Sequence, residues 1–426
     1  MRRLIPRFIF LSTLLASVAG AEEGTSRESP ADARARANAP TQSEPDVFSE
    51  LVSDLESPTP KQPAADATPA PTAPATTAAM NPEISVVADF ALAAFSDEAP
   101  LQSGAHDPTE NGFNLQQMEV SMRASVDPYL RFDAFLVFGL FGVELEEATG
   151  TTLDLPAGLQ LRFGQFASRF GRINATHPHS WDFADQPFAL GRIFGAEGQR
   201  GLGVELSWLT PLPWHVELVT SVSDAEGEDR NRSFLGAEDR RTEGPADLLW
   251  VAAAKQFFSL SDAWSLLWGT SAAFGPNASG RDNRTEVYGV DFFLKYRPLA
   301  GARYTQVRWQ TEVFHRRRQV PDNVVWDVSG YTQTAWRFAR RWESAGRYEL
   351  GSTPFDLDGR RVIDPLDPQW DGMRHRFSAS LSHFPTEFSR FRLQGSADLP
   401  DFRDSPIYAA FLTAELVAGA HGAHTF

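Results

Sequence analysis

The chain has 426 residues, no cysteine and a formal net charge of −16 at pH 7. Without cysteine, disulfide frameworks, thiolate zinc sites and cysteine nucleophiles are excluded. An acidic chain is poorly suited to nucleic acid or to an anionic membrane surface, so we expect no nucleic-acid partner.

The first 21 residues have the pattern of a secretory signal peptide. Three Arg precede an apolar run from Phe8 to Val18, and Ala19-Gly20-Ala21 offers the small residues of a cleavage site. The run is too short to cross a bilayer as a helix, and no later segment approaches the ~18 apolar residues that a transmembrane helix needs. An exported chain with no cysteine and no such helix is typical of the bacterial periplasm or outer membrane.

Residues 22–80 are rich in Ala, Pro, Thr, Ser and Glu and show no apolar period. Such a composition cannot bury a core, so we predict a disordered periplasmic linker. Within it, "DVFSELVSDLES" (46–57) has apolar residues at helical spacing. This segment is either a short amphipathic helix that docks on a partner or a transient helix in a tail, and the second interpretation is favoured.

From residue 81 onward, apolar and polar residues alternate with a period of two. In "YLRFDAFLVFG" (129–139), Phe132 belongs to an apolar face, whereas Arg131 and Asp133 belong to the opposite face. The same alternation recurs along the chain in segments of about ten residues, which is the pattern of β-strands with one apolar face.

Sixteen such strands are predicted. They are 83–95, 113–126, 129–138, 143–153, 159–168, 201–208, 214–223, 248–258, 263–275, 285–297, 303–317, 327–338, 342–350, 373–384, 388–398 and 406–426.

The connections between these strands alternate in length. Short ones such as 126–128 and 339–341 alternate with long ones at 169–200, 224–247, 318–326 and 351–372, with a short exception near 139–142. Transmembrane β-barrels have short periplasmic turns, longer outer loops, lipid-facing apolar residues and a polar lumen. We therefore predict an all-β fold, a transmembrane antiparallel up-and-down β-barrel of sixteen strands over residues 81–426. A soluble sandwich or propeller would leave the sixteen apolar faces without a core.

Aromatic residues cluster at the predicted strand ends, as in the girdles at the two interfaces of membrane barrels. They are Trp208, Trp214, Trp250, Trp264, Trp336, Trp342 and Tyr408. The last strand continues in phase to Phe426, which is similar to the terminal signal of outer-membrane barrels. We expect this end to engage the β-barrel assembly machinery and the protein to lie in the bacterial outer membrane, in contact with its lipid.

The segment "LQLRFGQFASRFGRIN" (159–174) resembles a strand of the phosphate-selective type of outer-membrane porins. Arg162, Gly164, Phe166, Phe170 and Gly171 match its L-R-x-G-x-F core and later F-G. The preceding "VELEEA" (143–148) and the following "GVELSW" (203–208) also resemble strands of that group, and the resemblance covers residues 83–426.

Similar porin-like chains carry the label zinc-regulated TonB-dependent outer-membrane receptor, and the ending "GAHGAHTF" resembles theirs. That label conflicts with the length, because such receptors need a barrel of twenty-two strands filled by a folded plug. Energised transport is therefore not expected here.

The resemblance implies that the connection 169–200 folds into the lumen and narrows it, facing charged residues on the wall. The candidates for lining the pore or its constriction are Arg131, Asp133, Arg162, His177, His179, Asp182, Arg192, Arg308, Arg374, Arg376 and Arg392. Rings of Arg favour anions and acidic rings favour cations. Because the signs are mixed, we expect selectivity to be weak or to be set by the constriction alone. Scattered solvated charges on a wet wall explain the pattern equally well.

Two histidine pairs, His177/His179 and His421/His424, raise the question of a metal. The first pair flanks Pro178 in a loop, and the second pair would point to opposite faces of a strand. We therefore predict no metal site and no cofactor. No G-x-S-x-G or H-E-x-x-H motif occurs, and we predict that the protein is not an enzyme.

The predicted function is passive diffusion of small polar solutes or ions through a water-filled lumen narrowed by loop 169–200. The alternative is a non-conducting receptor or binding barrel, in which the acidic outer loops 224–247 and 351–372 capture a ligand, metals included. Assembly as a homotrimer is implied by the resemblance alone.

Overall fold

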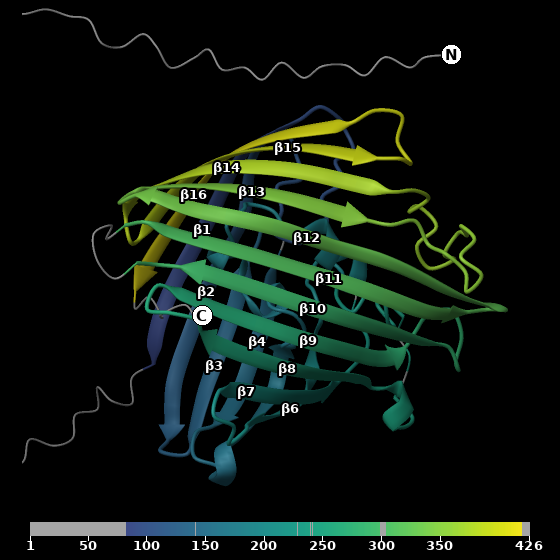
Figure 1. Cartoon of the computed structure of the whole chain (residues 1–426), viewed down its shortest axis with the longest axis horizontal. Helices are drawn as coiled ribbons and strands as arrows, with labels where there is room; N and C mark the ends of the chain where they lie inside the picture. The colour runs from purple at the N-terminus through teal and green to yellow at the C-terminus, as the bar shows by residue number, and fades with distance from the viewer. Residues whose placement is uncertain are drawn as a thin grey trace, which may run out of the picture. The chain divides into compact units, whose positions relative to one another are not determined.

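In a computed structural model, the described residues are 82–140, 142–227, 229–238, 240, 242–298 and 304–419. They form a closed barrel of sixteen antiparallel strands, each paired with its neighbours in chain order, with β1 paired to β16 (Figure 1). The strands are β1 (Glu83–Phe95), β2 (Gly112–Asp127), β3 (Leu130–Phe138), β4 (Val143–Thr152), β5 (Leu159–Ala167), β6 (Arg200–Leu209), β7 (His215–Ser223), β8 (Leu249–Ser259), β9 (Trp264–Pro276), β10 (Arg284–Tyr296), β11 (Gln306–Val320), β12 (Asn323–Ala339), β13 (Trp342–Gly351), β14 (Arg374–Thr386), β15 (Ser389–Pro400) and β16 (Ile407–Gly419). The predicted fold class and strand count are confirmed.

Short helical segments lie only in the connections of this described region. They are η3 (Pro156–Gly158), η4 (Ile173–Ala175), η5 (Pro178–Ser180), α2 (Phe188–Phe194) and η6 (Pro245–Asp247). None of the helices in the described ranges is long and apolar enough to cross a membrane.

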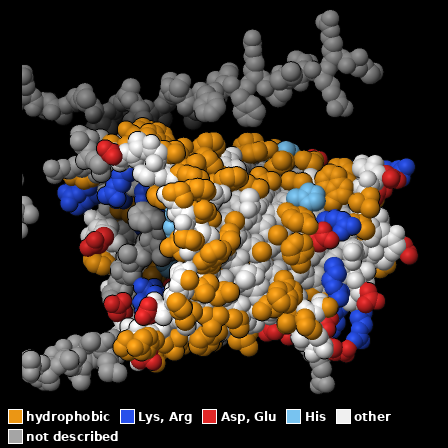
Figure 2. All heavy atoms as spheres, turned by 60° about the horizontal axis from the view of Figure 1, so that its bottom comes forward, with side chains coloured by type: hydrophobic (Ala, Val, Ile, Leu, Met, Phe, Trp, Pro, Cys, Tyr) orange, Lys and Arg blue, Asp and Glu red, His pale blue; other side chains and the backbone are white. Residues whose placement is uncertain are grey.

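The two faces of the strands follow the predicted alternation. On β3, the Phe132 side chain is 40% exposed on the outside, whereas Asp133 is 6% exposed. On β11, Trp309 and Val313 are exposed outward, while Glu312 is buried. Figure 2 shows the result on the face in view, a broad band of hydrophobic side chains across the barrel, with charged side chains gathered toward its two ends. All seven predicted girdle aromatics are exposed.

One predicted long connection, 318–326, is wrong. β11 and β12 continue to the pair Val320–Asn323, so that only two residues join them. Asp322 adopts a left-handed conformation with φ of 60°, which Asp tolerates better than most residues. The alternation continues there because Arg316 and Arg318 remain buried in ion pairs with Asp327 and Asp364 inside the barrel.

The interior is not uniformly polar, which differs from the predicted water-filled lumen. Toward the long-loop end, inward residues of β8 to β12 form an apolar cluster with the loops that fold inside. Its members include Phe170, Leu190, Ile193, Phe194, Phe234, Leu235, Leu249, Val251, Val287, Phe314 and Tyr331. The loops therefore bring a hydrophobic core of their own into this half of the barrel.

Several predictions concern residues outside the described ranges. These are the signal peptide 1–21, the whole linker 22–80 with its segment 46–57, the pair His421/His424 and the terminal Phe426. They stay predictions.

Candidate functional site

The connection between β5 and β6, residues 168–199, enters the barrel interior directly after β5. Two glycines of the L-R-x-G-x-F and F-G motif allow this path. Gly164 has φ of 121° and lies against the Ala148 carbonyl, and Gly171 has φ of 59° and lies against the Glu312 carboxylate. A side chain at either position would collide with its neighbour and strain the backbone.

Glu312 on β11 anchors the start of this loop. Its carboxylate accepts hydrogen bonds from the backbone N–H groups of Arg172 and Ile173, both at 2.9 Å. Tyr331 donates to the same carboxylate at 2.5 Å. Because Glu312 belongs to a strand six positions away from β5, the loop crosses the interior rather than following the wall.

The middle of the loop presents two carboxylates to a basic wall formed by β11 to β15. Asp182 pairs with Arg308 at 2.5 Å. Asp185 pairs with Arg347 at 2.7 Å and with Arg376 at 3.2 Å. Burial alone would raise the pKa of Asp185, but the two guanidinium groups hold that pKa below its ordinary value.

The loop continues into the helix α2, whose last turn carries Arg192. This guanidinium is buried, stacks over the Trp370 ring at 3.8 Å and donates to the Ser352 carbonyl at 2.8 Å. Burial lowers the pKa of Arg192 to about 10, although Asp327 and Asp367 oppose the shift. Since Trp370 and Asp367 lie in the connection 352–373, two long loops are joined inside the barrel.

Facing the other way, the loop presents His177 to an acidic wall formed by β2 and β4. Its Nδ1 lies 3.1 Å from Glu119 Oε2 and 3.3 Å from Glu146 Oε2, and its Nε2 lies 3.7 Å from Glu147 Oε1. Burial opposes the charged imidazolium, yet Glu119, Glu146 and Glu147 raise the pKa of His177 well above its ordinary value. The ring is also stacked on Phe135.

A β-bulge explains why two consecutive carboxylates point inward. In the pairing of β3 with β4, Phe135 is opposite Glu147 and Leu136 is opposite Leu145, so Glu146 has no partner. One extra residue in a strand reverses the facing of everything after it, and therefore Glu146 and Glu147 both line the interior. A similar shift between β1 and β2 leaves Gln116 unpaired, and its amide donates to the Ala184 carbonyl of the loop.

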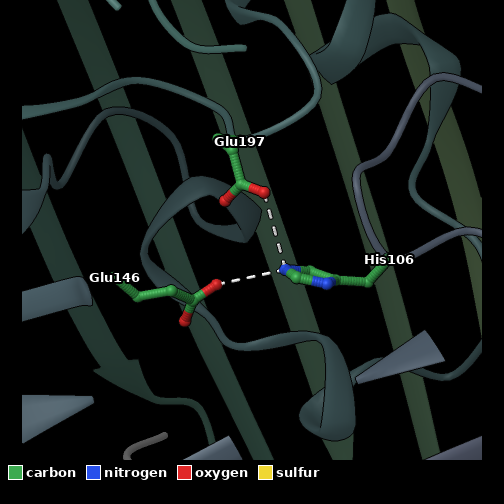
Figure 3. A group of neighbouring side chains, drawn as sticks. All are labelled: His106, Glu146 and Glu197. Atoms are coloured by element: carbon green, nitrogen blue, oxygen red, sulfur yellow. Dashed lines mark hydrogen bonds and ion pairs between the residues drawn. The ribbon is translucent and has the colours of Figure 1, made fainter. Parts of the chain in front are cut away.

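A second histidine reaches the same wall from the connection 96–111. His106 Nε2 lies 3.2 Å from Glu146 Oε1 and 3.6 Å from Glu197 Oε1 (Figure 3). Burial disfavours its charged form, but these carboxylates raise the pKa of His106 to about 9. Arg200 already neutralises this group, at 2.8 Å from Glu197 and 3.2 Å from Glu146.

Two cavities adjoin at His177. A vestibule of about 1460 Å³ opens toward the short-turn end, and it is bounded by residues 172–182 of the loop. A smaller cavity of about 50 Å³ lies between the loop, β4 and residues 104–107. His177, Glu147 and Thr176 line both cavities, so this group of side chains separates one cavity from the other.

The structure divides the eleven predicted pore residues into two groups. Seven line the vestibule, namely Arg131, Asp133, Arg162, His177, His179, Asp182 and Arg308. The other four do not contact that cavity and are buried. Arg192 is enclosed as described, Arg374 and Arg376 pair with Asp398, and Arg392 donates to the Trp181 carbonyl. A role in lining a pore stays a prediction for all of them.

Sequence reasoning missed His106, the pair Glu146/Glu147 as inward groups, and the connection 96–111 as an interior element. The carboxylates were visible in "VELEEA", but strict alternation cannot place both on one face. His106 gave no signal, because its importance comes only from the folding of its loop toward β4.

A closed sixteen-stranded barrel with a charged vestibule and a connection folded across its interior has the architecture of the outer-membrane porins. Solved structures with this fold include OprB of Pseudomonas putida, with a TM-score of 0.56, 9% identity, and coverage of 80% of this chain and 95% of that chain. The outer membrane channel DcaP of Acinetobacter baumannii has a TM-score of 0.52 and 11% identity, covering 80% and 97%. An anion-selective porin from Comamonas acidovorans has a TM-score of 0.51 and 9% identity, covering 79% and 99%.

In sequence, the chain is 30% identical over 387 residues to an uncharacterized protein of Aquifex aeolicus (strain VF5), a match that covers 81% of this chain and 80% of that protein. The chain belongs to the family of that protein. No family model matches this chain.

Proposed function

We propose that the protein is a channel of the bacterial outer membrane that lets small polar solutes or ions diffuse passively through its lumen, with loop 168–199 as the constriction. The vestibule of about 1460 Å³, lined by charged side chains and bounded by this loop, carries the proposal. The outer apolar band and the aromatic girdles support membrane insertion.

The charge of the vestibule supports a preference for anions. Among its described lining residues are eleven Lys or Arg against eight Asp or Glu. Several of the basic groups, including Arg337, Arg340 and Arg341, lie near the β12–β13 turn where a solute would enter or leave. A wall with an excess of positive charge raises the local concentration of anions. The resemblance to phosphate-selective porins and the likeness to an anion-selective porin agree with this direction.

The alternative, a binding barrel that does not conduct, is favoured by one observation. The loops 168–199 and 352–373, with the connection 224–248, fill much of the long-loop half with an apolar cluster and buried ion pairs. Against ligand capture by acidic loops, four of the five Asp residues in 352–373 are already paired with Arg, including Asp358 with Arg360. Asp364 pairs with Arg318, Asp367 with Arg232 and Asp371 with Arg361.

Single-channel recording of the full chain in a planar bilayer tests the proposal, with the reversal potential measured in a salt gradient. Stable ohmic steps of current are expected, with a reversal potential whose sign indicates selectivity for anions. A folded barrel that never conducts would contradict diffusion and favour the binding barrel. Crosslinking of the same preparation tests the homotrimer, and depletion of the assembly machinery tests its role in insertion.

A further inference from the structure

The group of Glu119, Glu146 and His177 lies where the two cavities adjoin, since Glu119 lines the vestibule, Glu146 lines the inner cavity and His177 lines both. Glu119 is 1% exposed, yet its Oε2 accepts no hydrogen bond of acceptable geometry, although His177 Nδ1 lies only 3.1 Å away. This buried oxygen contacts His177 and His179 without a well-aligned hydrogen bond, and a metal ion bound by the same atoms would satisfy it more fully.

The three atoms are spaced like ligands of one metal ion. Tetrahedral ligands with metal bonds of about 2.0–2.1 Å lie about 3.3 Å from one another. Here His177 Nδ1 is 3.1 Å from Glu119 Oε2 and 3.3 Å from Glu146 Oε2. All three ligand atoms lie within 4.8 Å of one another. His179 Nδ1 lies 3.5 Å from the same Glu119 oxygen, which places it beside the other three atoms.

The surroundings of His177 also match those of a metal ligand. While Nδ1 faces the two carboxylates, Nε2 faces Glu147 Oε1 at 3.7 Å. A carboxylate beside the second ring nitrogen fixes the tautomer and the orientation of a coordinating histidine. The Phe135 ring, stacked on the imidazole at 4.4 Å between centroids, restricts it further.

Charge distinguishes this group from the neighbouring one. The cluster of His106, Glu146 and Glu197 has similar ligand types, but Arg200 contacts both of its carboxylates. A divalent ion there would lie beside a guanidinium. In the His177 group, Arg200 contacts Glu146 alone, at Oε1, whereas Glu146 Oε2 and Glu119 Oε2 both face His177.

We propose that Glu119, Glu146 and His177, with His179 as the fourth ligand, bind one divalent transition-metal ion of the zinc type. Imidazole with carboxylates suits zinc and its neighbours, whereas magnesium and calcium take oxygen ligands alone. An ion at this position would lie between the vestibule and the inner cavity. The proposal does not depend on conduction.

The test is zinc binding to the full chain in detergent, after removal of metals with a chelator, measured by isothermal titration calorimetry. We expect one zinc ion per chain, with no competition from millimolar magnesium. E119Q and H177Q should weaken the affinity by at least roughly tenfold, since even residues behind the ligands change affinity by about 10–100-fold. H215Q, a histidine exposed at the start of β7, is the matched control and should bind as the natural chain does.

Three outcomes would overturn the proposal. The natural chain could bind no zinc, E119Q and H177Q could bind it as tightly as H215Q, or E197Q could lose as much affinity as E119Q, which would assign the ion to the His106 cluster. If the variants fail to fold, X-ray absorption of zinc on the natural chain decides. A shell of nitrogen and oxygen atoms with imidazole scattering supports the proposal, and a shell of water and carboxylate alone refutes it.

Discussion

The two sides of the barrel interior carry opposite charge. On β2 to β4 the inward groups include Glu119, Asp133, Glu146 and Glu147, whereas β11 to β15 present Arg308, Arg316, Arg347, Arg376 and Arg392. The loop that crosses between them is matched to both, since its histidines face the acidic wall and its aspartates face the basic wall. The order of charges within one short segment therefore fixes how the loop lies in the lumen.

The largest expected destabilisation follows from a substitution of Asp185, the loop residue that pairs with the basic wall. D185N removes the carboxylate that Arg347 and Arg376 share. Removing one partner of a buried pair costs about 3–5 kcal/mol, and the cost here should fall toward the lower end because Glu349 still pairs with Arg347 and Asp398 with Arg376. Faster proteolysis of loop 168–199 in the folded barrel is the expected result. D182N, whose pair with Arg308 is partly exposed, should have a smaller effect and is the matched control. Equal proteolysis of both variants would contradict the assignment of Asp185 as the main anchor.

The next largest effect is expected from substitutions on β3, where one variant changes the outer face and the other changes the inner face. F132R places a charge on the apolar outer face and should cost about 2–4 kcal/mol near the bilayer midplane. R131A, on the inner face, should be tolerated. Yield of heat-modifiable barrel in outer-membrane fractions measures both variants. If the two assembled equally well, the facing of β3 would be wrong.

Acid should release the loop from the basic wall. The folded-state pKa values of Asp182 and Asp185 are lowered, because their Arg partners outweigh burial. Their stabilisation is therefore complete above the ordinary Asp pKa of about 4 and is lost as the pH falls below it. Loop proteolysis by an acid-active protease should rise only below about pH 4. In D185N this increase in proteolysis should be smaller. An equal increase would show that the protonation of groups other than Asp185 releases the loop.

The smallest effect is on selectivity. R340E/R341E reverses two vestibule charges at the β12–β13 turn, and we expect the anion-to-cation permeability ratio to fall about two- to threefold. R360E, in the connection 352–373 and paired with Asp358, is the control and should leave the reversal potential unchanged. A shift of equal size in the control would show that general charge, not the vestibule, sets the selectivity.

Strand facing and strand number could be predicted from the sequence because every strand of a barrel in lipid alternates apolar outward residues with polar inward ones. Trp309 and Phe132 are exposed outward, whereas Glu312 and Asp133 are buried inside. The interior could not be predicted in the same way. The bulge at Glu146 lies between two segments that each alternate normally, so nothing local marks it. The burial of Arg316 and Arg318 depends on Asp327 and on Asp364 from a separate loop, and such pairing over long sequence distance has no period.

The two-residue turn between β11 and β12 also has a consequence for the cell surface. These strands of 15 and 17 residues extend far beyond the ~25 Å apolar band of a membrane barrel, and in Figure 1 their hairpin projects past its neighbours. On the opposite side, β3 and β4 are joined by only residues 139–142. The long-loop end of the barrel wall is thus high at β11 and β12 and low at β3 and β4. A large particle that approaches this end of the barrel would therefore meet the β11–β12 hairpin before it reaches the low side.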